Sequence, residues 1–161
     1  MNEFKKRNKL LAIYQIAGGF IGIVFMSYTL IMIENLQSRE LLVSTVPLTL
    51  FVFSIYSGNL LIGKHYSKGL AYSKVNQLIQ ILGFKISGLM YVFGSGLIMC
   101  VQFDLTDDFI TGFIFWTSYF EIGQLADRSQ FMISFNIIAI FLLFQVGKLR
   151  KQYESLKDRL I

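Results

Sequence analysis

Apolar residues fall in four long blocks along the chain, and charged residues collect at the edges of these blocks. The blocks cover about residues 10–33, 41–62, 75–101 and 131–149. A helix needs about 20 apolar residues to cross the ~30 Å hydrocarbon core of a bilayer. Lipid offers the backbone no hydrogen-bond partner, so a spanning block is expected to be helical. The pattern predicts an all-α fold, a polytopic membrane protein in which four transmembrane helices form a single domain.

The segment between the third and fourth blocks, residues 102–130, is predicted to be an interfacial or re-entrant piece outside the spans. Its apolar centre is only about twelve residues long, too short for a fifth span. If the centre is helical, four aromatic residues share one face at 4-3-4 spacing: Phe109, Phe113, Trp116 and Phe120. The helix is favoured, but the same residue types also favour strands, so a strand over 107–122 remains an alternative.

The distribution of basic residues predicts the orientation. Four of them precede the first block, three lie between the second and third, and five follow the fourth: Lys5, Lys6, Arg7, Lys9, Lys64, Lys68, Lys74, Lys148, Arg150, Lys151, Lys157 and Arg159. Only Arg39 and Arg128 fall in the other connections. Because cytoplasmic loops carry the excess of Lys and Arg, both termini are predicted to be cytoplasmic in a multi-pass protein of the inner or plasma membrane. The first block, about 24 residues long, exceeds the core of a signal peptide and is expected to be retained.

The same basic residues predict the partners. A basic rim beside the membrane attracts anionic lipid. Because this rim accounts for the net charge of +5, a nucleic-acid partner is not expected. Residues 148–161 are predicted to form a cytoplasmic amphipathic helix that continues the fourth span. Its apolar residues follow a heptad-like spacing: Leu149, Tyr153, Leu156 and Leu160. This helix either lies on anionic lipid or packs as a seam against a neighbouring chain.

The third block is the most polar and is the candidate functional element. Its polar residues include Gln77, Gln80, Lys85, Ser87 and Tyr91. On a helix, all of these except Lys85 recur, together with Phe84, at a 3-4-3-4 spacing, so they would share one face directed toward protein or water. That face either joins helices or lines a pore. An ionisable residue inside a span is a functional-site hypothesis by default, and Lys85 is the candidate, although it could also snorkel to the interface.

Two further features predict close packing of helices. Gly18 and Gly22 form a G-x-x-x-G pattern in the first block, which allows two helices to approach closely, within one chain or between two. Asn136 in the fourth block is expected to form hydrogen bonds between helices.

Composition argues against catalysis. The chain has 161 residues, of which 54% are hydrophobic and 16% charged, with one His and one Cys. A single His excludes an H-E-x-x-H motif, and no enzyme activity, cofactor or metal is expected. The sequence predicts a small non-enzymatic integral membrane protein that acts as a homo-oligomer, or as the membrane subunit of a complex with another membrane or cytoplasmic protein, through helix packing. The alternative is a channel, a pore-forming effector or a small transporter with Lys85 as the selectivity residue.

Overall fold

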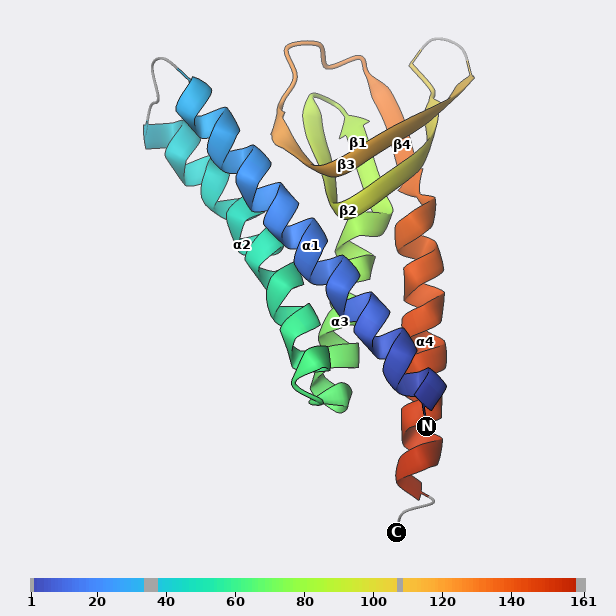
Figure 1. The fold of residues 1–161 in the computed structure, drawn as a ribbon. Coiled ribbons are helices and arrows are strands. Elements are labelled where there is room, and N and C mark those ends of the chain that lie inside the picture. Colours follow the sequence, from blue (N-terminus) through green and yellow to red (C-terminus); the bar gives the residue numbers. More distant parts are fainter. Residues whose placement is uncertain (1, 34–37, 107–108, 159–161) are drawn as a thin grey trace.

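Helices and strands both build the fold. The computed structural model describes residues 2–33, 38–106 and 109–158 (Figure 1). In chain order the elements are α1 (Asn2–Met32), α2 (Ser38–Ile62), α3 (Tyr66–Ile81), β1 (Leu82–Ile86), β2 (Leu89–Asp104), β3 (Ile110–Gln124), β4 (Phe131–Asn136) and α4 (Ile137–Asp158). The strands gather at one end of the molecule, and the first turn of α1 and the last turn of α4 lie toward the other end (Figure 1).

The predicted all-α fold is wrong, because the second half of the chain is largely a β-sheet. The third apolar block is helical only as far as Ile81, and the fourth is a strand up to Asn136 before its helix begins. The described part of 102–130 contributes β3, so the strand was the right alternative there; residues 107–108 lie outside the described residues. No four-helix bundle is present in the described ranges.

The sheet forms where the sequence changes its local preferences. Ser87 and Gly88 have φ values of 50° and 83° and join β1 to β2 as a two-residue hairpin turn. Positive φ at both central residues of such a turn matches the twist of the flanking strands. Aromatic and β-branched residues fit a pleated sheet. Both strands have such residues near the turn: Phe84 and Ile86 in β1, and Tyr91, Val92 and Phe93 in β2. The all-α prediction failed because it treated every long apolar block as lipid-exposed and therefore helical.

The antiparallel sheet curls around β2, its longest strand. The first part of β2 pairs with β1 and its last part with β4, while β1 and β4 also pair with each other. On its other side β2 pairs with β3 along nearly its whole length. The pairing shifts between Gly94 and Leu97, where Ser95 and Gly96 stand opposite Ser118 alone. Such a bulge bends a strand, and it turns this part of β2 toward α1.

The helices pack below and beside the sheet. α1 and α2 run side by side as a long hairpin, and α3 packs against both α2 and α4 (Figure 1). α4 starts at a side-chain cap, because Asn136 Oδ1 accepts hydrogen bonds from the backbone N–H groups of Ile138 (3.1 Å) and Ala139 (3.3 Å). The predicted cytoplasmic loop between the second and third blocks is mostly the helix α3.

Two helices are long and apolar enough, by length and composition, to span a membrane. They are α1 and α2, and they are the only two with this property among the described residues. In the most apolar window of each helix only 33% of the residues are buried inside the molecule. Both helices therefore present most of their apolar side chains outward.

An apolar core closes the end of the molecule that holds the first turn of α1. It brings together one or more residues from each of the four helices: Phe4, Leu11, Ala12, Leu61, Leu70, Val146 and Leu149. The ring of Phe4 packs against Tyr66 and Tyr153, at centroid distances of 5.2 and 6.2 Å. A second aromatic contact, between Phe51 and Phe93 (5.4 Å), joins α2 to the sheet.

Candidate functional site

A layer of buried polar side chains joins three helices to the sheet. We call it the polar layer; it comprises Gln15 of α1, Ser54 of α2, Ser73, Asn76 and Gln80 of α3, and Ser95 of β2. None of these residues is more than 3% exposed. Burying a polar group is unfavourable unless it is hydrogen-bonded, so the hydrogen-bond partners of these side chains determine whether the layer stabilises the fold.

Ser54 is at the centre of the polar layer. Its hydroxyl donates to the backbone oxygen of Gln15 (3.0 Å) and accepts from Asn76 Nδ2 (3.1 Å), while the Ser95 hydroxyl lies 2.9 Å away. Gln80 completes the connection to β2, because its Oε1 accepts the backbone N–H of Ser95 at 2.8 Å. These bonds fix the positions of α1, α2, α3 and the β2 bulge relative to one another.

Several buried polar atoms in this layer or beside it have no hydrogen-bond partner within the described residues. They are Asn8 Oδ1, Gln15 Nε2, Asn76 Oδ1 and both amide atoms of Gln77. Gln77 is the extreme case, since its side chain is fully buried and forms no bond at either end. An unpaired buried polar group costs about 1–3 kcal/mol. Gln77 is therefore expected to destabilise the fold it sits in.

The β2 bulge is held directly against α1. The Ser118 hydroxyl accepts from Gly96 N (2.9 Å) and donates to the Gly18 carbonyl oxygen (2.7 Å). The Tyr14 hydroxyl donates to the carbonyl oxygen of Leu97 at 3.0 Å. Gly18 makes this approach possible, because an added Cβ would lie 2.7 Å from the Cα of Gly96. The sheet is thus fixed beside the apolar stretch of α1 and not beyond its end.

A small mixed cavity of about 180 Å³ lies in the sheet, lined by Lys85 on β1 and by Trp116, Tyr119 and Glu121 on β3. Tyr119 donates its hydroxyl to Glu121 Oε2 at 2.7 Å, and burial together with this carboxylate raises the pKa of Tyr119. Trp116 and Tyr119 stack with ring centroids 5.6 Å apart. Cys100 lines the same cavity, and burial raises the pKa of its thiol.

Acidic residues of β2 and β3 lie near Lys85. Lys85 on β1 and Asp104 on β2 are both register partners of Met132 on β4, so they flank the same residue of the sheet. Hydrogen bonds from the hydroxyl and backbone N–H of Thr106 lower the pKa of Asp104, and the charge of Lys85 adds a smaller lowering. Lys85 therefore belongs to a polar group on the sheet and not to a helix face.

β3 forms an open edge of the sheet. Within the described residues it pairs only with β2, so its other side has unpaired backbone N–H and C=O groups. Its large side chains are strongly exposed: Ile110 (61%), Phe113 (79%), Phe115 (66%) and Trp116 (53%). An exposed apolar edge of this kind is a template for pairing with another strand.

The structure separates the polar residues that the sequence placed on one helix face. Gln77 and Gln80 are on α3, while Lys85 is on β1 beside the sheet cavity. Ser87 lies in the β1–β2 turn. The Tyr91 hydroxyl donates to the carbonyl oxygen of Ile79 at 3.1 Å and ties β2 to the end of α3. The face that would have lined a channel does not exist as a continuous surface.

The residues expected to pack helices are used inside the chain. Gly18 contacts the β2 bulge, and an added Cβ at Gly22 would overlap the ring of Phe51 on α2. Asn136 caps α4 instead of linking two helices.

The C-terminal apolar residues also face this chain. Leu149 is buried at 3% exposure, and Tyr153 and Leu156 pack against the same core as Phe4. Leu160 lies outside the described residues.

Two features of the site were not foreseen from the sequence. The polar layer depends on serines, of which Ser54 and Ser95 are inconspicuous inside apolar blocks. The open edge depends on β3, whose Phe113-Ile114-Phe115-Trp116 run is apolar throughout and shows no period-2 alternation; its only strand signal is its aromatic and β-branched residues.

Comparisons with protein-family models, with curated proteins and with solved structures found no match for this chain. Within the described residues, no group of three or more His, Cys, Asp or Glu side chains is arranged to hold a metal ion.

Proposed function

We propose that this chain is a non-enzymatic integral membrane protein, anchored by α1 and α2, that assembles with a second copy through the open edge of β3. The outward faces of the two helices support the membrane placement. Their exposed residues are large and apolar, among them Phe20 (64%), Val24 (57%) and Ile31 (78%) on α1 and Leu42 (71%) and Val52 (55%) on α2. Such extended apolar surface marks a membrane or protein interface.

The charges support an orientation with both chain ends in the cytoplasm. The basic residues before the first block and those at the end of α4 belong to the end of the molecule opposite the strands (Figure 1). The α2–α3 connection with Lys64 is at that end too. An excess of Lys and Arg on one side is the signature of the cytoplasmic face.

The open edge of β3 carries the proposal of assembly. Gly18 lies well inside the apolar stretch of α1, and the sheet is bonded to it, so a bilayer around α1 also surrounds part of the sheet. An unpaired sheet edge does not occur in hydrocarbon, because each unsatisfied backbone group there costs several kcal/mol. Another protein must therefore cover β3. A second copy can do so across a two-fold axis, with two β3 strands antiparallel.

Membrane integration is the first expected result. Full-length protein in membranes should stay in the pellet after extraction with alkaline carbonate and dissolve only in detergent, because the exposed faces of α1 and α2 are apolar. A peripheral protein held by the basic residues alone would be released by carbonate or high salt. Release into the soluble fraction would contradict the membrane placement.

Assembly through β3 is tested by disulfide cross-linking in membranes. The single cysteine, Cys100, is replaced by alanine, and one cysteine is introduced at a time at each residue of Ile110–Gln124, because across a two-fold axis only the residues at the axis lie opposite their own copies. Paired strands lie about 4.8 Å apart, within the range of a disulfide, so at least one position should give a covalent dimer.

Matched controls are single cysteines on the lipid faces of the helices, at the exposed Phe20 and Leu42. They should remain monomeric under the same oxidation. If β3 cysteines and helix cysteines cross-link equally, or no β3 position does, β3 is not the interface between copies. A cross-link from β3 to a different membrane protein would replace the second copy with a partner subunit.

A further inference from the structure

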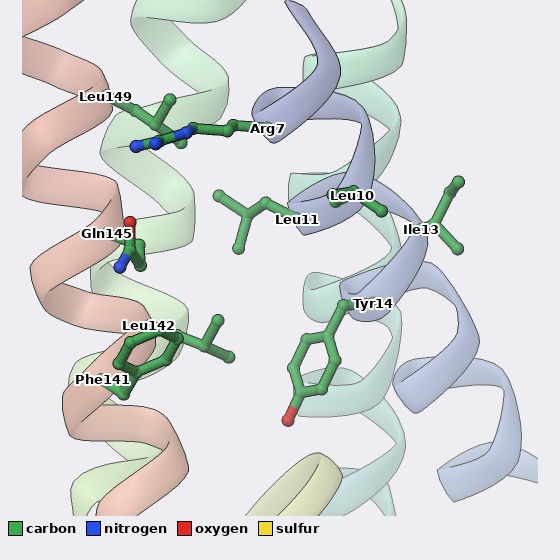
Figure 2. Close-up of a pocket in the computed structure, with 9 residues that line it drawn as sticks. All are labelled: Arg7, Leu10, Leu11, Ile13, Tyr14, Phe141, Leu142, Gln145 and Leu149. Atoms are coloured by element: carbon green, nitrogen blue, oxygen red, sulfur yellow. The ribbon is translucent and has the colours of Figure 1, made fainter. Parts of the chain in front are cut away.

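A cleft of about 470 Å³ opens between α1 and α4. The two helices are close together near their chain ends and diverge toward the sheet (Figure 1). Figure 2 shows Leu11 and Tyr14 of α1 and Phe141 and Leu142 of α4 around the space between the helices. The walls of the cleft are almost entirely apolar, so it suits a hydrocarbon chain and not a polar solute.

Arg7 is the one charged residue among those that line the cleft. Its side chain extends from α1 toward α4 at the end of the cleft marked by Leu149 (Figure 2). Arg7 Nη2 donates to Glu3 Oε1 at 2.7 Å, but both side chains are well exposed. Exposed ion pairs contribute little, and Glu3 takes one of five guanidinium N–H donors, so Arg7 can bind a further anion.

The depth of the cleft matches part of an acyl chain. The step of seven positions from Arg7 to Tyr14 rises about 10 Å along the helix axis, roughly a third of the ~30 Å hydrocarbon core. The hydroxyl of Tyr14 is bonded to Leu97, so its ring is held in place at the inner end. Arg7 precedes the first apolar block by three residues, which places its charge near the level of the lipid headgroups.

We infer that this cleft binds an anionic phospholipid of the cytoplasmic leaflet. One acyl chain lies between α1 and α4, and the guanidinium of Arg7 binds the headgroup phosphate. The apolar walls select a lipid, and the single cation at the headgroup end selects an anionic one, because charge-assisted contacts from arginine to phosphate are strong and directional. The inference rests on the proposed membrane placement of α1, but it does not depend on assembly through β3.

The test is lipid binding to the detergent-solubilised full-length protein, measured by native mass spectrometry. Phosphatidylglycerol and phosphatidylcholine with identical acyl chains are titrated separately. Wild-type protein should bind phosphatidylglycerol more tightly, because the choline cation of phosphatidylcholine offsets the attraction of its phosphate to Arg7. Arg7→Gln should weaken phosphatidylglycerol binding about tenfold and phosphatidylcholine binding less, so that the preference between the two lipids falls. Leu142→Trp, which fills the cleft, should weaken the binding of both lipids.

Two control variants separate the cleft from general effects. Lys6→Gln removes an exposed charge from the same turn of α1, and Phe144→Trp enlarges an exposed side chain of α4; neither residue lines the cleft. Both should bind lipid as the wild type does. Equal losses in Lys6→Gln and Arg7→Gln, or unchanged binding in both Arg7→Gln and Leu142→Trp, would overturn the inference. If the protein resists carbonate extraction but gives either of these lipid-binding results, only the proposal of a lipid in the cleft is refuted. If carbonate releases the protein, the proposed membrane placement is refuted.

Discussion

Replacing Gly18 with alanine should prevent stable folding or lower the unfolding temperature strongly. The added Cβ would lie 2.7 Å from both the backbone carbon of Ser95 and the Cα of Gly96. Backbone at a hydrogen-bonded bulge cannot move aside as the end of a flexible side chain could. Overpacking of this kind costs about 3 kcal/mol, a large part of the stability of a small domain.

The matched control is Gly147→Ala on α4. A Cβ at Gly147 would meet nothing within 4 Å, and glycine within a helix is less favourable than alanine by about 0.5–1 kcal/mol. This variant should therefore be as stable as the wild type or slightly more stable. Both variants are compared by thermal unfolding in detergent, followed by circular dichroism, and by the fraction that elutes as folded protein. Equal stability of the two would mean that α1 does not contact the β2 bulge at Gly18.

The position of Gly18 shows how far the sequence could predict the structure. The G-x-x-x-G pattern marks two positions where other groups lie close to α1: the backbone of the β2 bulge at Gly18 and the ring of Phe51 at Gly22. It could not indicate that a strand, and not a helix, makes the approach to Gly18. Close approach requires only a missing side chain, and the partner is decided by the register of β2 some 80 residues away in the chain.

The sheet was missed for a different physical reason. Apolar blocks of spanning length were assigned to helices because lipid offers no hydrogen-bond partners to the backbone N–H and C=O groups of a lone strand. The Ser87-Gly88 dipeptide and the aromatic residues around it favoured a hairpin locally. Whether the segment forms a helix or a hairpin depends on whether other backbone groups are near enough to pair with it. In this fold they come from the strand β4, about 45 residues further along the chain.

The polar residues of α3 were recognised as a group, but their roles could not be told apart from spacing. Gln77 and Gln80 lie three residues apart on one helix, and both are buried. Gln80 Nε2 donates to the Asn76 carbonyl oxygen within α3, and the packing of β2 against α3 gives Gln80 Oε1 the backbone N–H of Ser95, while the Gln77 amide has no partner among the described residues. The two glutamines therefore have opposite expected effects on stability.

Replacing Gln77 with leucine should stabilise the protein, and replacing Gln80 with leucine should destabilise it. Gln77→Leu removes two unpaired buried polar atoms and substitutes an apolar side chain of similar size, a gain of about 1–3 kcal/mol. Gln80→Leu removes the acceptor of the Ser95 N–H and the donor to the Asn76 carbonyl oxygen, and leaves both buried groups without those partners. Its cost is about 1–3 kcal/mol, so the two variants should differ by several kcal/mol.

Each of the two variants is the control for the other, because both changes place a leucine at a buried position of the same helix. Midpoints of thermal unfolding in one detergent should move in opposite directions from the wild type. A loss of stability in Gln77→Leu as large as that in Gln80→Leu would show that the Gln77 amide binds a buried water or another polar group, since only a bonded amide is costly to remove. The polar layer would then extend to Gln77.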